Sequence, residues 1–245
     1  MLLCGHRGLA SLAPENTLSG LDAAHKQGLT WVEIDVQLTQ DNQVVLFHDE
    51  RLHRCTNGRG LLREHSWQQL SRLDAGRWFS AEFASERLVL LHDYLTHAAR
   101  LNIKVNIELK LYPKDNAANL SQQVSRVISC GAFAHANLLF SSFEPNSLVQ
   151  MQRLQPTIAR ALLVERIPTD WHAALQRLDC AALNCNHRHL TQAQAQAVNA
   201  AGYQLNCYTV NSQRQADTLA SWGVNMIFTD KPLRQAPGAQ HQAPS

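Results

Sequence analysis

Short apolar segments alternate with amphipathic segments along most of the chain. Most of the apolar segments are separated by a stretch with helical periodicity. In the first predicted helix, at 16–28, we expect Asn16 to be the N-cap and Gly28 the C-terminal stop. The alternation of strands and helices predicts a parallel sheet with right-handed crossovers. About eight such units in 245 residues predict an α/β fold, a closed (β/α)₈ TIM barrel. Apolar runs of strand length occur at 2–5, 31–36, 102–110, 137–143, 158–164, 181–186, 203–210 and 225–230, and a polar turn leads into a further short strand within 41–48.

One segment interrupts this rhythm. Residues 50–90 are too many and too irregular for a single strand-and-helix unit, so we expect a small insertion after the second strand, packed beside the barrel. The remainder of 1–234 then forms a single catalytic domain. Residues 235–245 carry no packing pattern, and we expect them to be a disordered tail.

Composition narrows the class of protein. A hydrophobic content of 45% with 17% charged residues provides a large core, and a net charge of +2 argues against nucleic acid or an anionic membrane as a partner. No run of 18 apolar residues exists, so stable membrane association is not expected. The N-terminus lacks the features of a signal peptide, which predicts a cytoplasmic location. The pattern leaves the oligomeric state open.

Acidic side chains stand inside two of the predicted strands. Glu33 and Asp35 are two positions apart in one strand, and Glu108 occupies the corresponding face of N-I-E-L-K at 106–110. Because strand side chains alternate between faces, all three carboxylates point to the barrel interior near its carboxyl-terminal rim. Clustered carboxylates need a cation, and oxygen-only ligation suits one Mg²⁺, Ca²⁺ or Mn²⁺ ion. The alternative is that each acid is satisfied separately by Arg7, Lys110 or backbone N–H groups.

Basic side chains are expected at the same rim. Arg7 follows the first strand and Lys110 ends the strand of Glu108, and two cations beside a divalent ion form a pocket for phosphate. His6 and His48 also follow strands, and both titrate near neutral pH. The two histidines therefore suit proton transfer, one as base and one as acid, although the sequence does not assign the roles.

An ordered set of motifs resembles the glycerophosphodiester phosphodiesterase family and extends from Gly5 to Pro232. The compact form without a signal is most similar to the cytosolic bacterial enzymes. One stretch departs from the family pattern, at 88–92, and it lies outside the expected chemistry. The matching motifs are G-H-R-G (5–8), A-P-E-N-T (13–17), E-I-D-V-Q-L-T (33–39), F-H-D (47–49), T-N-G (56–58), L-D-A-G-R-W (73–78), N-I-E-L-K (106–110), S-S-F (141–143), Y-T-V-N (208–211) and T-D-K-P (229–232).

The resemblance implies a TIM barrel that hydrolyses glycerophosphodiesters, such as glycerophosphocholine or glycerophosphoethanolamine, to sn-glycerol 3-phosphate and an alcohol. It implies that Glu15 lies near the site; capping of the first helix is the alternative role. Phe143 and Tyr208 follow or end strands and are candidates to line the pocket for the glycerol or the leaving alcohol. The residues that match the family's machinery are the metal ligands Glu33, Asp35 and Glu108, the catalytic pair His6 and His48, and the phosphate contacts Arg7 and Lys110.

Two other functions remain open at this level. A related barrel could cleave intact lipids in the manner of a phospholipase D, although the loops of this chain are mostly polar. A barrel that binds metal or phosphate without catalysis is the non-enzymatic alternative. Within the favoured reaction, the attacking oxygen is either water or a neighbouring glycerol hydroxyl, which would give a cyclic phosphate.

Overall fold

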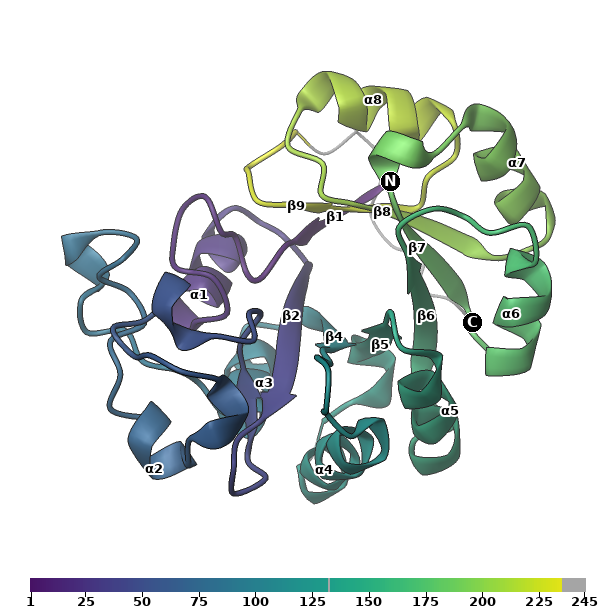
Figure 1. Ribbon diagram of the computed structural model, residues 1–245. Helices are drawn as coiled ribbons and strands as arrows, with labels where there is room; N and C mark the ends of the chain where they lie inside the picture. Colours follow the sequence, from purple (N-terminus) through teal and green to yellow (C-terminus); the bar gives the residue numbers. More distant parts are fainter. Residues whose placement is uncertain (132, 235–245) are drawn as a thin grey trace.

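The computed structural model, which describes residues 1–131 and 133–234, is a closed parallel barrel (Figure 1). Within these residues the barrel order is β1-β9-β8-β7-β6-β5-β4-β2, and pairing of β1 with β2 closes the ring. The predicted (β/α)₈ TIM barrel is therefore confirmed. The barrel strands are β1 (Leu2–Gly5), β2 (Trp31–Leu38), β4 (Lys104–Leu109), β5 (Leu138–Ser142), β6 (Ala159–Val164), β7 (Ala182–Asn186), β8 (Gln204–Tyr208) and β9 (Met226–Thr229).

The main hydrophobic core lies between the outer faces of the strands and the helices that surround them. Val32, Ile34 and Ile107, for example, are fully buried in it. Burial of each helix's apolar stripe against the sheet is what stabilises these short helices. The surrounding helices are α1 (Leu18–Lys26), α3 (Leu91–Arg100), α4 (Ala117–Cys130), α5 (Pro145–Leu154), α6 (Trp171–Leu178), α7 (Gln192–Ala200) and α8 (Gln213–Ser221), and the turns η4 (His135–Asn137) and η5 (His187–His189) are 3₁₀ helices.

The start of α1 differs from the prediction. Thr17, not Asn16, is the N-cap, and its side-chain oxygen accepts a hydrogen bond from the Gly20 backbone N–H at 3.1 Å. Asn16 instead adopts a left-handed conformation with φ 56° and directs its side chain to Asp35. The expected stop is confirmed, because Gly28 follows the last turn with φ 72°, a conformation that glycine adopts at little cost.

The strand predicted within 41–48 is present as β3 (Val44–Leu46), but it lies outside the barrel ring and runs antiparallel to β2. β3 can pair with β2 because β1 is shorter than β2. β1 pairs only with Trp31 and Val32, so the same edge of β2 is open further along, and β3 pairs there with Val36–Leu38. This pairing satisfies the exposed edge and leads the chain outward from the barrel rim.

The segment at 50–90 lies beside the barrel, next to α1, and is blue in Figure 1. It contains η1 (Leu52–Arg54), η2 (Leu62–Glu64), α2 (Trp67–Leu70) and η3 (Ala81–Phe83). Leu52, Leu62 and Leu70 form a hydrophobic cluster of their own with Val45 and Phe47. The chain therefore returns to α3 through a separately packed unit. The expected tail at 235–245 lies outside the described residues.

The barrel interior changes character along its axis. Cys4, Leu139, Ala182 and Phe228 are among the residues that fill the lower part with apolar side chains. Buried polar side chains replace them toward the carboxyl ends of the strands. The polar rim is thus where the strands can build a binding site. Among the helices of the described ranges, none has the length and hydropathy needed to cross a bilayer.

Candidate active site

The three predicted acids meet at the carboxyl-terminal rim of the barrel. The register between β2 and β4 pairs Asp35 with Glu108 and Glu33 with Asn106, so all three carboxylates point to the interior from adjacent strands. One oxygen from each acid lies within 4.8 Å of the other two, and all three side chains are buried. The predicted cluster is therefore formed by strand register alone.

Burial and mutual repulsion both act on the pKa values of these acids. Burial, and then the charges of Asp35 and Glu108, raise the pKa of Glu33 well above its ordinary value. Burial and the Asp35 charge raise the pKa of Glu108 to about 7. Burial also acts on Asp35, but Arg7, His48 and Lys110 outweigh it and hold the pKa at about 2. The protein thus concentrates more negative charge here than its own cations neutralise.

The donor set fits a divalent cation. Among the described residues, Glu33 Oε1 is a buried carboxylate oxygen without a hydrogen-bond partner. Such an atom is costly unless a ligand meets it. Because the converging donors are all carboxylate oxygens, the three residues can hold a hard cation.

Arg7 is held beside the acids by the turn that follows β1. Its backbone N–H donates to Glu33 Oε2 at 3.0 Å, with Arg7 itself at φ 54°. Gly8, at φ 95°, lies so close to α1 that a Cβ would come within 2.7 Å of the Gly20 carbonyl carbon. The turn therefore requires glycine at this position. It directs the Arg7 guanidinium between Asp35, at 3.4 Å, and Glu15, at 2.8 Å.

Glu15 contacts the site and does not cap α1. Its carboxylate accepts hydrogen bonds from Arg7 and, at 2.7 and 2.8 Å, from Arg54. Burial acts to raise the pKa of Glu15, but the bonds and charges of Arg54 and Arg7 lower it below its usual range. Glu15 is therefore an anion that holds Arg7 in place.

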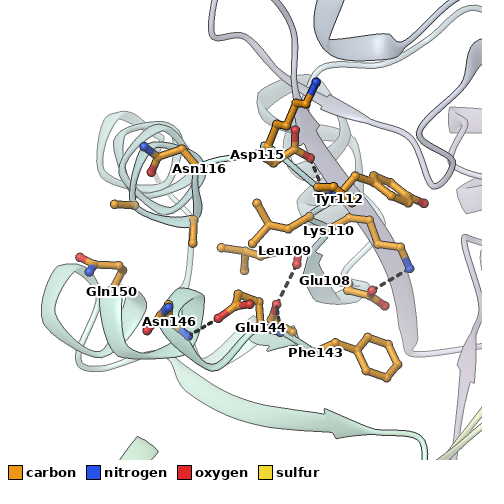
Figure 2. A pocket seen from close by; sticks show the side chains of 16 residues that line it. Glu108, Leu109, Lys110, Tyr112, Asp115, Asn116, Phe143, Glu144, Asn146 and Gln150 are labelled. Atoms are coloured by element: carbon orange, nitrogen blue, oxygen red, sulfur yellow. Dashed lines mark hydrogen bonds and ion pairs between the residues drawn. The ribbon is translucent and has the colours of Figure 1, made fainter.

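Lys110 lies on the other side of the acids. Its Nζ is 3.0 Å from Glu108 Oε1, 3.7 Å from Asp35 Oδ1 and 5.9 Å from the centre of the Phe143 ring. Figure 2 shows Glu108, Lys110 and Phe143 together at one end of a groove. Phe143 and Tyr208 meet edge to face at 5.9 Å, and the Tyr208 hydroxyl donates to the Val164 carbonyl.

Each of the two predicted histidines is bound by an acid through Nδ1. His6 Nδ1 is 2.7 Å from Asp230 Oδ1, and His48 Nδ1 is 2.8 Å from Asp49 Oδ1. A carboxylate at Nδ1 fixes the ring and leaves Nε2 for substrate. His6 Nε2 lies 3.9 Å from Glu33 Oε2, which places this ring beside the acid cluster.

Sequence reasoning did not single out these two acids. The signal was present, since Asp49 follows His48 directly and Asp230 follows the last strand in T-D-K-P. The register of β1 with β9 pairs Gly5 with Thr229, so the next residues, His6 and Asp230, are neighbours. Only closure of the barrel makes that pairing, because 224 positions separate the two residues along the chain.

Two side chains, Gln37 and Tyr112, hold the backbone of the loop that carries His48. Gln37, on the same face of β2 as the acids, donates to the carbonyls of Phe47, His48 and Asp49 at 2.7–3.1 Å. The Tyr112 hydroxyl donates to the His48 carbonyl at 2.6 Å. Burial lowers the pKa of His48 although the charge of Asp35 opposes this, so the ring is neutral near pH 7. A neutral, fixed imidazole can accept a proton.

Two hollows open from this cluster. One, of about 430 Å³, lies at the ends of β1 and β9 and is lined by His6, Arg7 and Trp78 among others. The other, of about 970 Å³, extends from Lys110 and Phe143 at the ends of β4 and β5 toward α4 and α5 (Figure 2). A ligand with two arms joined at an anionic centre would fit this arrangement.

Comparison with known proteins agrees with this geometry. The model of the Glycerophosphoryl diester phosphodiesterase family matches residues 6–234. The chain is 30% identical to a glycerophosphodiester phosphodiesterase of Caldanaerobacter subterraneus subsp. tengcongensis and 31% identical to one of Bacillus altitudinis, with 94% of each chain covered in both cases.

A solved structure gives the same result. The Oleispira antarctica phosphodiesterase in complex with the product sn-glycerol-3-phosphate superposes with a TM-score of 0.90 at 34% identity, covering 95% of this chain and 94% of that one. The match of the family model over nearly the whole chain, together with these relatives, establishes the resemblance that the motifs indicated. This chain therefore belongs to the glycerophosphoryl diester phosphodiesterase family and is a phosphoric diester hydrolase.

Proposed function

We propose that this enzyme hydrolyses small glycerophosphodiesters, such as glycerophosphocholine or glycerophosphoethanolamine, to sn-glycerol 3-phosphate and an alcohol. The convergence of three buried carboxylates with Arg7, Lys110 and two acid-bound histidines carries the proposal. The product bound by the Oleispira antarctica relative supports the glycerol phosphate half of the substrate. The cytoplasmic location stays a prediction.

One divalent cation, Mg²⁺ or Ca²⁺ with Mn²⁺ as a further candidate, is proposed to bind Glu33, Asp35 and Glu108. The unpartnered Glu33 Oε1 and the carboxylate-only donor set support this choice. When bound, the cation supplies positive charge that balances the acids and stabilises an anionic substrate.

Arg7 and Lys110 are proposed to bind the phosphoryl oxygens. Each is fixed by carboxylates, Arg7 by Glu15 and Asp35 and Lys110 by Glu108, so neither must be ordered when substrate arrives. Burial acts to lower the pKa of Lys110, but Glu108 and Asp35 outweigh it and raise the pKa, so the ammonium stays charged. Preorganised cations of this kind stabilise charge that develops on the phosphoryl oxygens.

His6 and His48 are proposed to transfer the protons. One ring takes a proton from the attacking oxygen at Nε2, and the other donates one to the leaving alkoxide. Asp230 and Asp49 hold the opposite nitrogens and stabilise each imidazolium as it forms. The attacking oxygen is either water or the adjacent glycerol hydroxyl, and trapping a cyclic phosphate would identify the second route.

Release of sn-glycerol 3-phosphate from glycerophosphocholine tests this function, with Mg²⁺ and Ca²⁺ titrated separately. We expect turnover that EDTA abolishes, and a loss of at least about 100-fold in both His6→Ala and His48→Ala, in line with general acid–base catalysis. His92→Ala is the matched control, because His92 is exposed and also bonded to an adjacent acid, Asp93, at 3.2 Å. Near-normal turnover of both active-site variants with metal saturating would contradict the proposal.

Phosphatidylcholine vesicles provide the second arm of the assay. A small-molecule diesterase leaves them intact, whereas faster cleavage of vesicles than of glycerophosphocholine would favour the phospholipase D-like alternative. Binding of metal without turnover of either substrate would favour a non-catalytic barrel.

A further inference from the structure

Arg54 joins the segment at 50–90 to the candidate active site through both edges of its guanidinium group. Nε and Nη2 donate to the two oxygens of Asp49 at 2.5 and 2.8 Å. Nη1 and Nη2 donate to the two oxygens of Glu15 at 2.7 and 2.8 Å. Two bidentate carboxylate pairs on one guanidinium use almost all of its donors, so Arg54 has little freedom to move.

Each of these carboxylates holds one residue of the proposed chemistry. Asp49 Oδ1 binds His48 Nδ1 at 2.8 Å, and Glu15 Oε1 binds Arg7 Nη1 at 2.8 Å. Arg54 therefore stands at the centre of two short chains, one ending at a proton-transfer group and the other at a phosphate-binding group. Its side chain is 40% exposed, and its contacts with Asp49 and Glu15 account for its position.

From this geometry we infer that Arg54 is a positioning residue. It holds Asp49, which aligns His48, and it also holds Glu15, which aligns Arg7. This inference rests on the proposed function, because it assigns Arg54 a part in the same reaction. Through Arg54, the segment at 50–90 then contributes to catalysis independently of Trp78, one of its residues that line the smaller hollow.

Lysine cannot replace arginine in this role. An ammonium group is a point charge and cannot bind two carboxylates in bidentate fashion at once. An arginine could instead serve only to attach the segment to the barrel. Arg63 is the control for that role. Arg63 lies in the same segment and pairs with Glu50 at 2.8 Å and Asp115 at 3.7 Å, but it contacts neither Glu15 nor Asp49.

The experiment compares Arg54→Lys and Arg54→Gln with the matched variants Arg63→Lys and Arg63→Gln in excess Mg²⁺. Turnover of glycerophosphocholine gives kcat and KM, and thermal unfolding checks that each variant is folded. Titration of the His48 ring by ¹⁵N NMR, assigned with His48→Gln, gives a readout that does not depend on activity.

We expect Arg54→Lys to lower kcat/KM at least tenfold, mainly through kcat, because small misplacements of catalytic groups cost about this much or more. Arg54→Gln should lower it further and raise the pKa of His48, since Asp49 loses its cation and acts more strongly on the imidazolium. Both Arg63 variants should stay within about threefold of the wild type.

The inference is overturned if folded Arg54 variants keep wild-type kcat/KM and the His48 titration does not move. It is also overturned if the Arg63 variants lose as much activity as the Arg54 variants, because attachment of the segment would then explain both. An inactive wild type would refute the proposed function instead, and the His48 titration alone would then decide the role of Arg54. If Arg54→Gln fails to fold, Arg54→Lys supplies the same comparison.

Discussion

Removal of divalent cations should make the stability of this protein fall as the pH rises from 5 to 8. The cause is Glu108, whose pKa is raised from an ordinary value of 4.5 to about 7 by burial and by Asp35. Between these two values the native state holds a proton that the unfolded state has lost. Stability therefore decreases with increasing pH in this window and becomes constant above the native pKa.

The magnitude follows from the gap between the two pKa values. A gap of roughly 2.5, at about 1.4 kcal/mol for each pKa unit, corresponds to about 3 kcal/mol in the free energy of unfolding. For a domain of this size that is a fall in Tm of roughly 6–12 °C. Glu33, whose pKa is also raised, acts in the same direction. Asp35, with a pKa of about 2, stays ionised across this window and does not contribute to the slope.

The assay is thermal and urea unfolding of the EDTA-treated protein at several pH values, with Glu108→Gln as the comparison. Glutamine is neutral at every pH, so groups that the Glu108 charge does not influence cancel in the difference between the two proteins. Glu33 does not cancel fully, because the Glu108 charge contributes to its raised pKa. Without metal, Glu108→Gln should be the more stable protein at pH 8 by about 3 kcal/mol and nearly equal to wild type well below pH 4.5, the ordinary value of the Glu108 pKa. Added Mg²⁺ should stabilise the wild type and have much less effect on the variant.

A metal-free wild type that loses no stability relative to Glu108→Gln as the pH rises would refute this reasoning. It would mean that the three carboxylates are already compensated by Arg7 and Lys110, which is the alternative that the sequence left open. Calorimetric binding of Mg²⁺ to the two proteins at pH 8 would then show no loss from the substitution.

Other substitutions separate catalysis, substrate binding and folding. Asp230→Asn should lower kcat/KM at least tenfold, because a neutral amide stabilises the His6 imidazolium poorly; Asp93→Asn is the control, and equal activities of the two variants would contradict the role of Asp230. Thr17→Ala should lower the free energy of unfolding by about 1 kcal/mol through loss of the α1 cap, with Mg²⁺ affinity unchanged in calorimetry; no loss in urea unfolding would contradict it. Phe143→Ala should raise KM for glycerophosphocholine several-fold with little change in Tm, since this side chain is 47% exposed; an unaltered KM would exclude Phe143 from the pocket.

The sequence by itself determined the barrel and the acid cluster. Both follow from local periodicity, since alternation of strands and helices dictates the parallel sheet, and the spacing of two between Glu33 and Asp35 dictates a common face. The motif G-H-R-G likewise placed His6 and Arg7 at the rim, because both residues follow the end of the first predicted strand. The barrel and the common face of Glu33 and Asp35 needed no knowledge of which strands are neighbours, whereas their meeting with Glu108 depends on the pairing of β2 with β4.

Only the tertiary structure decided which side chains bind one another. Closure of the ring joins β1 to β9 and brings Asp230 to His6, and the open edge of β2 accepts β3 in an antiparallel direction that strand periodicity does not encode. Asparagine is a residue type that favours the helix N-cap, but the side chain of Asn16 bonds instead to the carboxylate and the backbone N–H of Asp35. The contacts of Arg54 connect the loop after β1 with the stretch that follows β3. Such pairings depend on distances across the fold, and the order of residues along the chain carries no direct signal of them.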